Sequence, residues 1–239
     1  MKRSEKIIIG ILTVGLLAAI CFGGTIAYMT DSEKDTNTFT VGTLDITLEE
    51  KNWDDGTDGK EAKPGDTFVK DPVAEAVEND SYMRMVVKLI DTETGNVITD
   101  AGRAALILQT IRFDSTYNVQ AQTGGTGLEE DESYSLDDVA GFPTVNPAFT
   151  LDTGRSSDGT YYYNYNNVFT EGTRAVLFTN IVIPTDWSQV QLDALGGFTV
   201  EVTAQAIQAA NFDSAQEAFN ALDGEISGGT LNVDYKTTK

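Results

Sequence analysis

The chain has 239 residues, a formal net charge of −21 and no histidine. The negative charge disfavours nucleic acid and anionic membrane surfaces as partners, because like charges repel. The missing imidazoles exclude Ser-His-Asp and Cys-His catalysis as well as the H-E-x-x-H zinc motif. The length fits one large domain with a substantial core.

The N-terminus has the pattern of an export signal. Basic residues within the first six positions precede an uncharged run, 7–30. Thr25 and Ala27 are small residues two apart, so we predict signal cleavage between Ala27 and Tyr28. An uncleaved anchor is the alternative, because a run of this length also suffices to span a bilayer.

The only cysteine, Cys21, lies within the uncharged run, so the mature product would have no thiol and no disulfide. Ile20 precedes it where a lipoprotein signal needs a small residue. We therefore expect a secreted product in the extracellular matrix or at the cell surface, without membrane attachment after cleavage. Signal peptidase is its expected partner during export.

Alternation of apolar and polar residues predicts antiparallel strands. The pattern is clearest over 198–206, and Ile46 and Leu48 continue it near the N-terminus. The run 82–90 is apolar on both faces apart from Arg84 and Lys88, which is typical of a central strand.

Two further β-rich runs, 161–169 and 174–183, flank a turn at Gly172 and predict a hairpin. Three helices are expected. One runs from Asp100 to Ile111, one over 187–195 between a cap at Thr185-Asp186 and Gly196, and one over 215–222 between a cap at Asp213 or Ser214 and Gly224. Strands with short helices and no βαβ alternation predict an all-β, jelly-roll-like antiparallel sandwich.

We expect three parts in the chain. They are a signal peptide (1–27), an N-terminal arm (28–41) and a jelly-roll-like domain (42–239) with an acidic, Gly-rich insertion near 122–141. Extended at about 3.3 Å per residue, the polar part of the arm reaches roughly 36 Å, which is enough to reach a second subunit.

Several segments resemble the TasA/camelysin family in their order along the chain, with an unmatched middle from 91 to 160. They are Gly23–Ala27, Phe39–Ile46, Lys63–Asp66, Tyr82–Val86, Tyr161–Asn164, Gly172–Phe178, Ile183–Pro184, Trp187 and Ala204–Gln208. In that family a dedicated, SipW-like signal peptidase releases secreted proteins that build biofilm matrix fibres. The resemblance implies that this chain is such a subunit.

The resemblance also implies donor-strand assembly, in which the arm of one molecule completes a sheet of the next. On that analogy the apolar anchors of the arm are Tyr28, Met29, Phe39 and Val41. The implied partners are copies of the same chain in a head-to-tail filament, together with an accessory fibre subunit. From the residues alone, the alternative is an N-terminal strand that pairs within its own domain or frays.

Two other functions remain open. One is a secreted camelysin-like peptidase, but the chain has no imidazole and, once mature, no thiolate for zinc, so we assign no catalytic residue and expect no enzyme. The other is a monomeric surface module that binds glycans through its tyrosines, Tyr161, Tyr162, Tyr163 and Tyr165.

No cofactor is expected. Asp54, Asp55 and Asp58 form the densest acidic cluster, and their alternating carboxylates resemble calcium ligands. The twelve-residue spacing with a terminal bidentate Glu is absent, so a solvated turn is the simpler interpretation.

Overall fold

The computed structural model describes residues 30–31, 45–49, 62–124, 127–129 and 132–227. All strand pairs in these ranges are antiparallel, and the helices are few and short. The predicted all-β antiparallel sandwich is thereby confirmed. None of the helices in these ranges has the length and hydropathy of a bilayer span.

Five strands form the largest sheet, in the order β1-β11-β5-β8-β7. Their bounds are β1 (Thr30–Asp31), β5 (Ser81–Asp91), β7 (Phe149–Leu151), β8 (Thr160–Tyr165) and β11 (Phe198–Gln208). β5 and β11 pair along their whole length, from Ser81 opposite Gln208 to Asp91 opposite Phe198. The central position predicted for β5 is confirmed.

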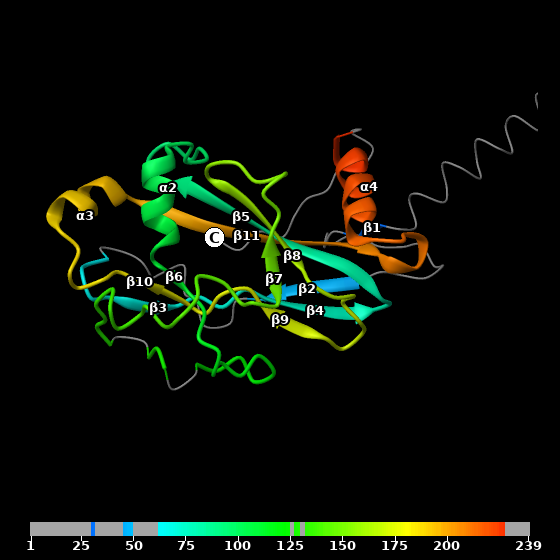
Figure 1. Ribbon diagram of the computed structural model, residues 1–239, viewed down its shortest axis with the longest axis horizontal. Helices are drawn as coiled ribbons and strands as arrows, with labels where there is room; N and C mark the ends of the chain where they lie inside the picture. The colour runs from blue at the N-terminus through cyan, green and yellow to red at the C-terminus, as the bar shows by residue number, and fades with distance from the viewer. Residues whose placement is uncertain (1–29, 32–44, 50–61, 125–126, 130–131, 228–239) are drawn as a thin grey trace, which may run out of the picture.

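Two three-stranded sheets lie on one side of the large sheet (Figure 1). One consists of β2 (Asp45–Glu49), β4 (Val73–Glu78) and β9 (Arg174–Val176), and the other of β3 (Thr67–Val69), β10 (Asn180–Val182) and β6 (Ile111–Arg112). Together they form the second layer of the sandwich.

The core fills the space between the layers. In β11, Val200, Val202, Ala204 and Ala206 are at most 6% exposed, which confirms the predicted apolar face, although Thr203 and Gln205 on the other face are also buried, at 8% and 7%. They join one cluster with residues of β5 and of the small sheets, such as Met83, Met85, Val87, Leu89, Ile46, Leu48, Ala74 and Ile181. Each fully buried aliphatic side chain stabilises the fold by about 1.5–3 kcal/mol.

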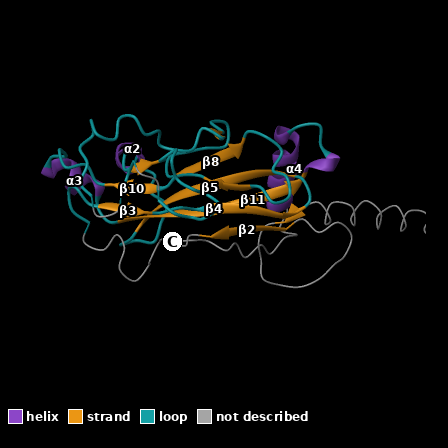
Figure 2. Cartoon of the chain, turned by 90° about the horizontal axis from the view of Figure 1, so that it is seen from below, coloured by secondary structure: helices purple, strands orange, loops and turns teal. Residues whose placement is uncertain are grey.

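Three helices stand at the two ends of the large sheet (Figure 2). α2 (Ala101–Leu108) is capped by the carboxylate of Asp100, as predicted. α3 (Gln189–Leu195) begins two residues later than predicted, because Ser188 forms a capping box with Gln191. α4 (Ala215–Ser227) continues through Gly224, so the predicted stop there is wrong. A short 3₁₀ turn, η1 (Ala209–Asn211), precedes it.

The predicted hairpin between 161–169 and 174–183 is wrong. The turn itself exists, since Gly172 has φ +75 and the Thr173 N–H donates to the Thr170 carbonyl. However, β8 pairs with β5 and β7, whereas β9 pairs with β4 in a different sheet. Each run alternates correctly, and alternation does not specify which strand it pairs with.

The segment near 122–141 forms no helix or strand wherever it is described. It is nevertheless anchored, because Leu128 and Val139 are buried against Val182 of β10. Asp114 holds its start by accepting hydrogen bonds from the N–H groups of Gly127 and Leu128.

Candidate functional site

The residues predicted to act in cleavage, strand donation and calcium binding lie outside the described part of the chain. They are Ala27, Tyr28, Met29, Phe39, Val41, Asp54, Asp55 and Asp58. Of the arm itself, the structure describes only Thr30 and Asp31. These two residues pair with β11 of the same chain, Thr30 opposite Ile207 and Asp31 opposite Ala206.

The outer edge of β11, the side that faces away from β5, is the candidate site. β1 covers this edge at Ala206 and Ile207 only. From Phe198 to Gln205 no strand in the described ranges pairs with it. Every second backbone N–H and C=O along this stretch points outward, as at any edge strand. Among the described residues, this stretch of the edge thus has backbone groups without a strand partner.

The two faces of β11 differ in chemistry. Val200, Val202 and Ala204 point into the core, so a strand added at the outer edge would extend the core with its own side chains. On the opposite face, Glu201 lies across from Lys88 of β5, and Gln205 across from Arg84. An added strand thus needs apolar residues at alternate positions and polar residues between them.

α4 covers the end of this edge where the arm pairs. Its residues Ala218, Phe219 and Leu222 form an apolar cluster with Ile207 of β11, against which Tyr82 of β5 packs. Figure 1 shows α4 standing beside β1 at this end of the sheet. The helix therefore fixes the strand end at which Thr30 is seated.

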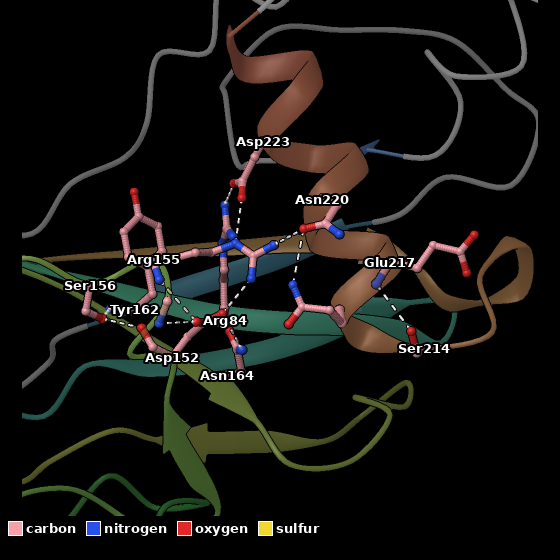
Figure 3. A network of polar contacts seen from close by, with 12 residues as sticks. Arg84, Asp152, Arg155, Ser156, Tyr162, Asn164, Ser214, Glu217, Asn220 and Asp223 are labelled. Atoms are coloured by element: carbon pink, nitrogen blue, oxygen red, sulfur yellow. Dashed lines mark hydrogen bonds and ion pairs between the residues drawn. The ribbon is translucent and has the colours of Figure 1, made fainter.

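A buried arginine attaches α4 to the sheet (Figure 3). The Arg84 side chain is 1% exposed and lies between the rings of Tyr162 and Phe219, with its Cζ 4.9 and 5.0 Å from the two centroids. Its Nε donates to Gln205 Oε1 at 2.7 Å, and its Nη2 pairs with the carboxylate of Asp223 on α4. The cation is thus neutralised by the helix that covers it.

A second arginine extends the network to the loop between β7 and β8 (Figure 3). Arg155 donates from Nε to Asp223 and from Nη1 to Asp152, both at 2.6 Å. Burial alone would raise the pKa of Asp223, but the hydrogen bonds from Arg84 and Arg155 outweigh burial and hold that pKa below its ordinary value. Two cations and two carboxylates therefore balance each other across three elements.

This network was not predicted from the sequence. The available signal was Arg84, an arginine on the apolar central strand 82–90, because a charge in such a place needs a partner. Nothing in the sequence indicated that the partner would be Asp223, which is 139 residues away.

The tyrosine run is used for packing. Tyr163 is 6% exposed in the core, and burial raises its pKa to about 12. Tyr165 makes edge-to-face contacts with Phe149 and Phe169, with centroids 5.4 and 5.2 Å apart. Tyr162 lies on the other face beneath Arg84. This arrangement leaves no row of parallel exposed rings in β8 for a sugar to stack on.

At the Phe198 end of β11, Asp91 provides a test of acid sensitivity. A hydrogen bond from Arg103, reinforced by Thr94, lowers the pKa of Asp91 to about 2. A group with a lowered folded-state pKa stabilises the fold above its unfolded pKa, and this stabilisation is lost as the pH falls through the folded value.

We therefore expect the thermal midpoint of the wild-type protein to decrease as the pH is lowered from about 4 to about 2. The decrease should be smaller in Asp91→Asn. Thermal melts followed by circular dichroism at both ends of this range measure the difference. Equal slopes for the two proteins would contradict the assigned role of the Arg103–Asp91 pair.

The family described as camelysin metallo-endopeptidase matches residues 2–124, which is about half of the chain. The chain belongs to this family. The TasA/camelysin resemblance is thereby confirmed, and the segments quoted for it from Tyr161 onward lie outside the matched residues. A comparison with curated proteins found no match.

The family description names a metal-dependent peptidase, and the residues of this camelysin-family chain do not fit such a centre. There is no histidine in the whole sequence, and Cys21 is the only cysteine. Over the described ranges no three Asp, Glu, Cys or His side chains come together as metal ligands. Since peptidase zinc is held by imidazole with carboxylate, we derive no step through a metal.

Proposed function

We propose that the chain is a secreted structural subunit of extracellular biofilm matrix fibres. In this proposal the N-terminal arm of one copy inserts as an antiparallel strand beside β11 of the next, and the repeated insertion makes a filament. The observation that carries the proposal is the outer edge of β11, which has a strand partner at Ala206 and Ile207 and none within the described ranges from Phe198 to Gln205.

The position of β2 argues that the chain cannot fill this edge with its own arm. Asp45, where β2 begins, lies opposite Glu78 at the end of β4, and β5 then starts at Ser81 opposite Gln208. The connection from Asp31 to Asp45 thus leaves and returns at the same end of the sheet.

Continued in the observed register, an arm in its own domain would bring Phe39 opposite Phe198 at the far end. The return from there to Asp45 spans about 26 Å, whereas the residues between reach only about 20 Å. A copy whose arm leaves its own body is tethered at one end only, so its arm can follow the edge of a neighbour.

The side chains of the arm also favour insertion beside β11 of a neighbouring molecule over pairing along the whole edge of the same chain. In the observed register Glu33 and Asp35 would have the same orientation as Asp31, opposite the core-facing residues of β11. Burying unpaired carboxylates costs several kcal/mol, roughly 2–7 for a polar group without a hydrogen bond. A neighbour's arm is free to choose a shifted register, in which Phe39 and Val41 lie opposite core-facing residues of the stretch 198–205 while Glu33 and Asp35 lie beyond that stretch.

The proposal assigns no catalytic role, since the sequence supplies no imidazole. Signal peptidase acts during export, and an accessory fibre subunit is a further partner on the family analogy. In size-exclusion chromatography the mature protein should form larger assemblies as its concentration rises, whereas a glycan-binding module would elute as a monomer at all concentrations.

Deletion of residues 28–38 with secretion retained should abolish fibres, because it removes the strand that joins the copies. Electron microscopy of the purified mature protein measures this, and retained circular dichroism shows that the domain still folds. A matched control replaces 30–38 with a Gly/Ser segment of equal length, which preserves reach but removes strand propensity. Fibres of normal length from the deletion would sink the proposal.

A further inference from the structure

Arg112 differs from the other arginines of the described ranges because it has no carboxylate partner there. The other four all form ion pairs: Arg84 with Asp223, Arg103 with Asp91, Arg155 with Asp152 and Asp223, and Arg174 with Glu49 and Glu75. The chain has 37 acidic and only 16 basic side chains, so carboxylates are plentiful. An arginine without one therefore needs a physical reason.

Arg112 lies on β6, on the face of the small sheet that points away from the core. Its neighbour Ile111 packs in the main core, and alternation along a strand places Arg112 on the opposite face. Arg112 is 9% exposed and pairs with Asn180 of β10, which is 2% exposed. Part of the segment 122–141 packs against Val182 on the same face. The cation is thus almost enclosed.

The side of the guanidinium that is suited to bidentate binding has no protein partner in the described ranges. Nη1 donates to the carbonyl oxygen of Ile111 at 2.7 Å, whereas Nε is buried and has no hydrogen-bond partner. Nε and Nη2 carry parallel N–H groups on the side of the group away from Nη1. Two parallel N–H groups of this kind bind two oxygens of a carboxylate or phosphate.

Asp114, two residues further along the chain, does not neutralise Arg112. Its carboxylate accepts four hydrogen bonds, from the N–H and hydroxyl of Thr116 and from the N–H groups of Gly127 and Leu128. This acid therefore holds the loop that follows β6 and forms no ion pair with Arg112.

The other groups around Arg112 favour an anion. The Thr179 hydroxyl donates to Asn180 Oδ1 at 2.7 Å, which leaves the amide N–H groups of Asn180 as further donors on the face of Arg112. Burial lowers the pKa of Arg112, and no carboxylate opposes that effect. A buried charge without a counter-ion is costly, so a negative ligand would stabilise this part of the fold.

We propose that Arg112 binds a small oxyanion from solution, with inorganic phosphate as its simplest representative. Two oxygens of the anion accept hydrogen bonds from Nε and Nη2, and the amide of Asn180 lies on the same face as a third donor. The bound anion neutralises the cation beneath the segment 122–141. This site is independent of the arm and of the β11 edge, so it holds whether or not the chain forms fibres.

The net charge of −21 does not prevent this binding. At an ionic strength of 0.1 M the Debye length is about 10 Å, so distant exposed carboxylates are largely screened. A buried cation in contact with the anion is screened much less. The local charge of Arg112 therefore determines the sign of the interaction.

Thermal melts of the mature protein test the site. The thermal midpoint should rise when phosphate replaces chloride at constant ionic strength, because a ligand that binds only the folded state stabilises it. Arg112→Met should lose most of this rise, and the matched control Arg174→Met should keep it. Equal rises in all three proteins would reflect the general stabilising effect of phosphate and would overturn the inference.

Nuclear magnetic resonance of the Arg112 Nε–H group in the wild-type monomer tests the same site without a substitution that alters the fold. The resonance is assigned by its absence from Arg112→Lys, and it should shift with phosphate until it saturates. The internal control is Arg174, whose Nε and Nη2 lie 3.4 Å from Glu75 and 3.5 Å from Glu49. A linear drift of both resonances without saturation would overturn the inference.

The same spectra distinguish the other possible partners of Arg112. If the Arg112 resonance in chloride buffer already shows the shift of a carboxylate-bound arginine, a carboxylate of the chain itself occupies the site and the inference is wrong. If that shift appears only as the protein concentration rises, the carboxylate comes from a second copy, which also overturns the inference. The proposed site requires that the shift follow phosphate and not protein concentration.

Discussion

Gly159→Ala is expected to lower the free energy of unfolding by about 2–5 kcal/mol, the sum of backbone strain and overpacking. Gly159 has φ +77, and a Cβ on it would lie 2.1 Å from the carbonyl oxygen of Ile98. The backbone cannot move away freely, because the Gly159 carbonyl accepts a 2.8 Å hydrogen bond from the Leu89 N–H in the central strand.

Gly172→Ala is the matched control for that variant. Gly172 has a nearly equal φ of +75, but no atom lies within 4 Å of the position of its Cβ. This variant should lose only the free energy that a residue with a Cβ needs to adopt a left-handed backbone conformation, about 1–2 kcal/mol of unfolding free energy. Urea unfolding of both variants separates strain from clash, and equal losses would show that the contact with Ile98 has no cost.

Asp223→Asn is expected to destabilise the protein by about 2–3 kcal/mol. Removing one partner of a buried pair costs about 3–5 kcal/mol because the other charge stays buried, and we reduce that figure because Asp223 is partly exposed. Arg84, at 1% exposed, would keep its charge between two rings and lose its carboxylate.

Asp158→Asn controls for the change in net charge. Asp158 is exposed in the loop between β7 and β8 and should change stability by less than about 0.5 kcal/mol. Urea unfolding measures both variants, and proteolysis of α4 reports whether the helix has left the sheet. If the two variants unfold alike, the Arg84–Asp223 pair does not hold α4.

Two ion pairs, Arg84–Asp223 and Arg103–Asp91, lie at opposite ends of the β11 edge. The pair of Arg84 and Asp223 fixes α4 over Ile207, where the arm is seated. Asp91 and Arg103 tie the other end, since Arg103 also donates to the carbonyls of Leu195 and Gly197, just before Phe198. Both ends of the proposed acceptor edge are thus held in place by ion pairs.

Local patterns predicted much of the fold. The strand at 198–206 was predictable because its apolar face recurs with a period of two, and the strand at 82–90 because it is apolar on both faces, as a central strand is. The start of α2 was predictable because Asp100 bonds a backbone N–H only three residues away. At α3, by contrast, two neighbouring capping residues competed, and Ser188 with Gln191 prevailed over Asp186.

The amino-acid sequence by itself determined the antiparallel all-β class, the lack of any imidazole ligand and the membership of the camelysin family. Only the tertiary structure decided that β8 and β9 enter different sheets, that Asp223 neutralises Arg84, and that the edge of β11 from Phe198 has no strand partner in the described ranges. The reason is physical. Periodicity and capping act between neighbours in the chain, whereas strand pairing and charge compensation depend on contacts between residues far apart, and many pairings satisfy the same alternation.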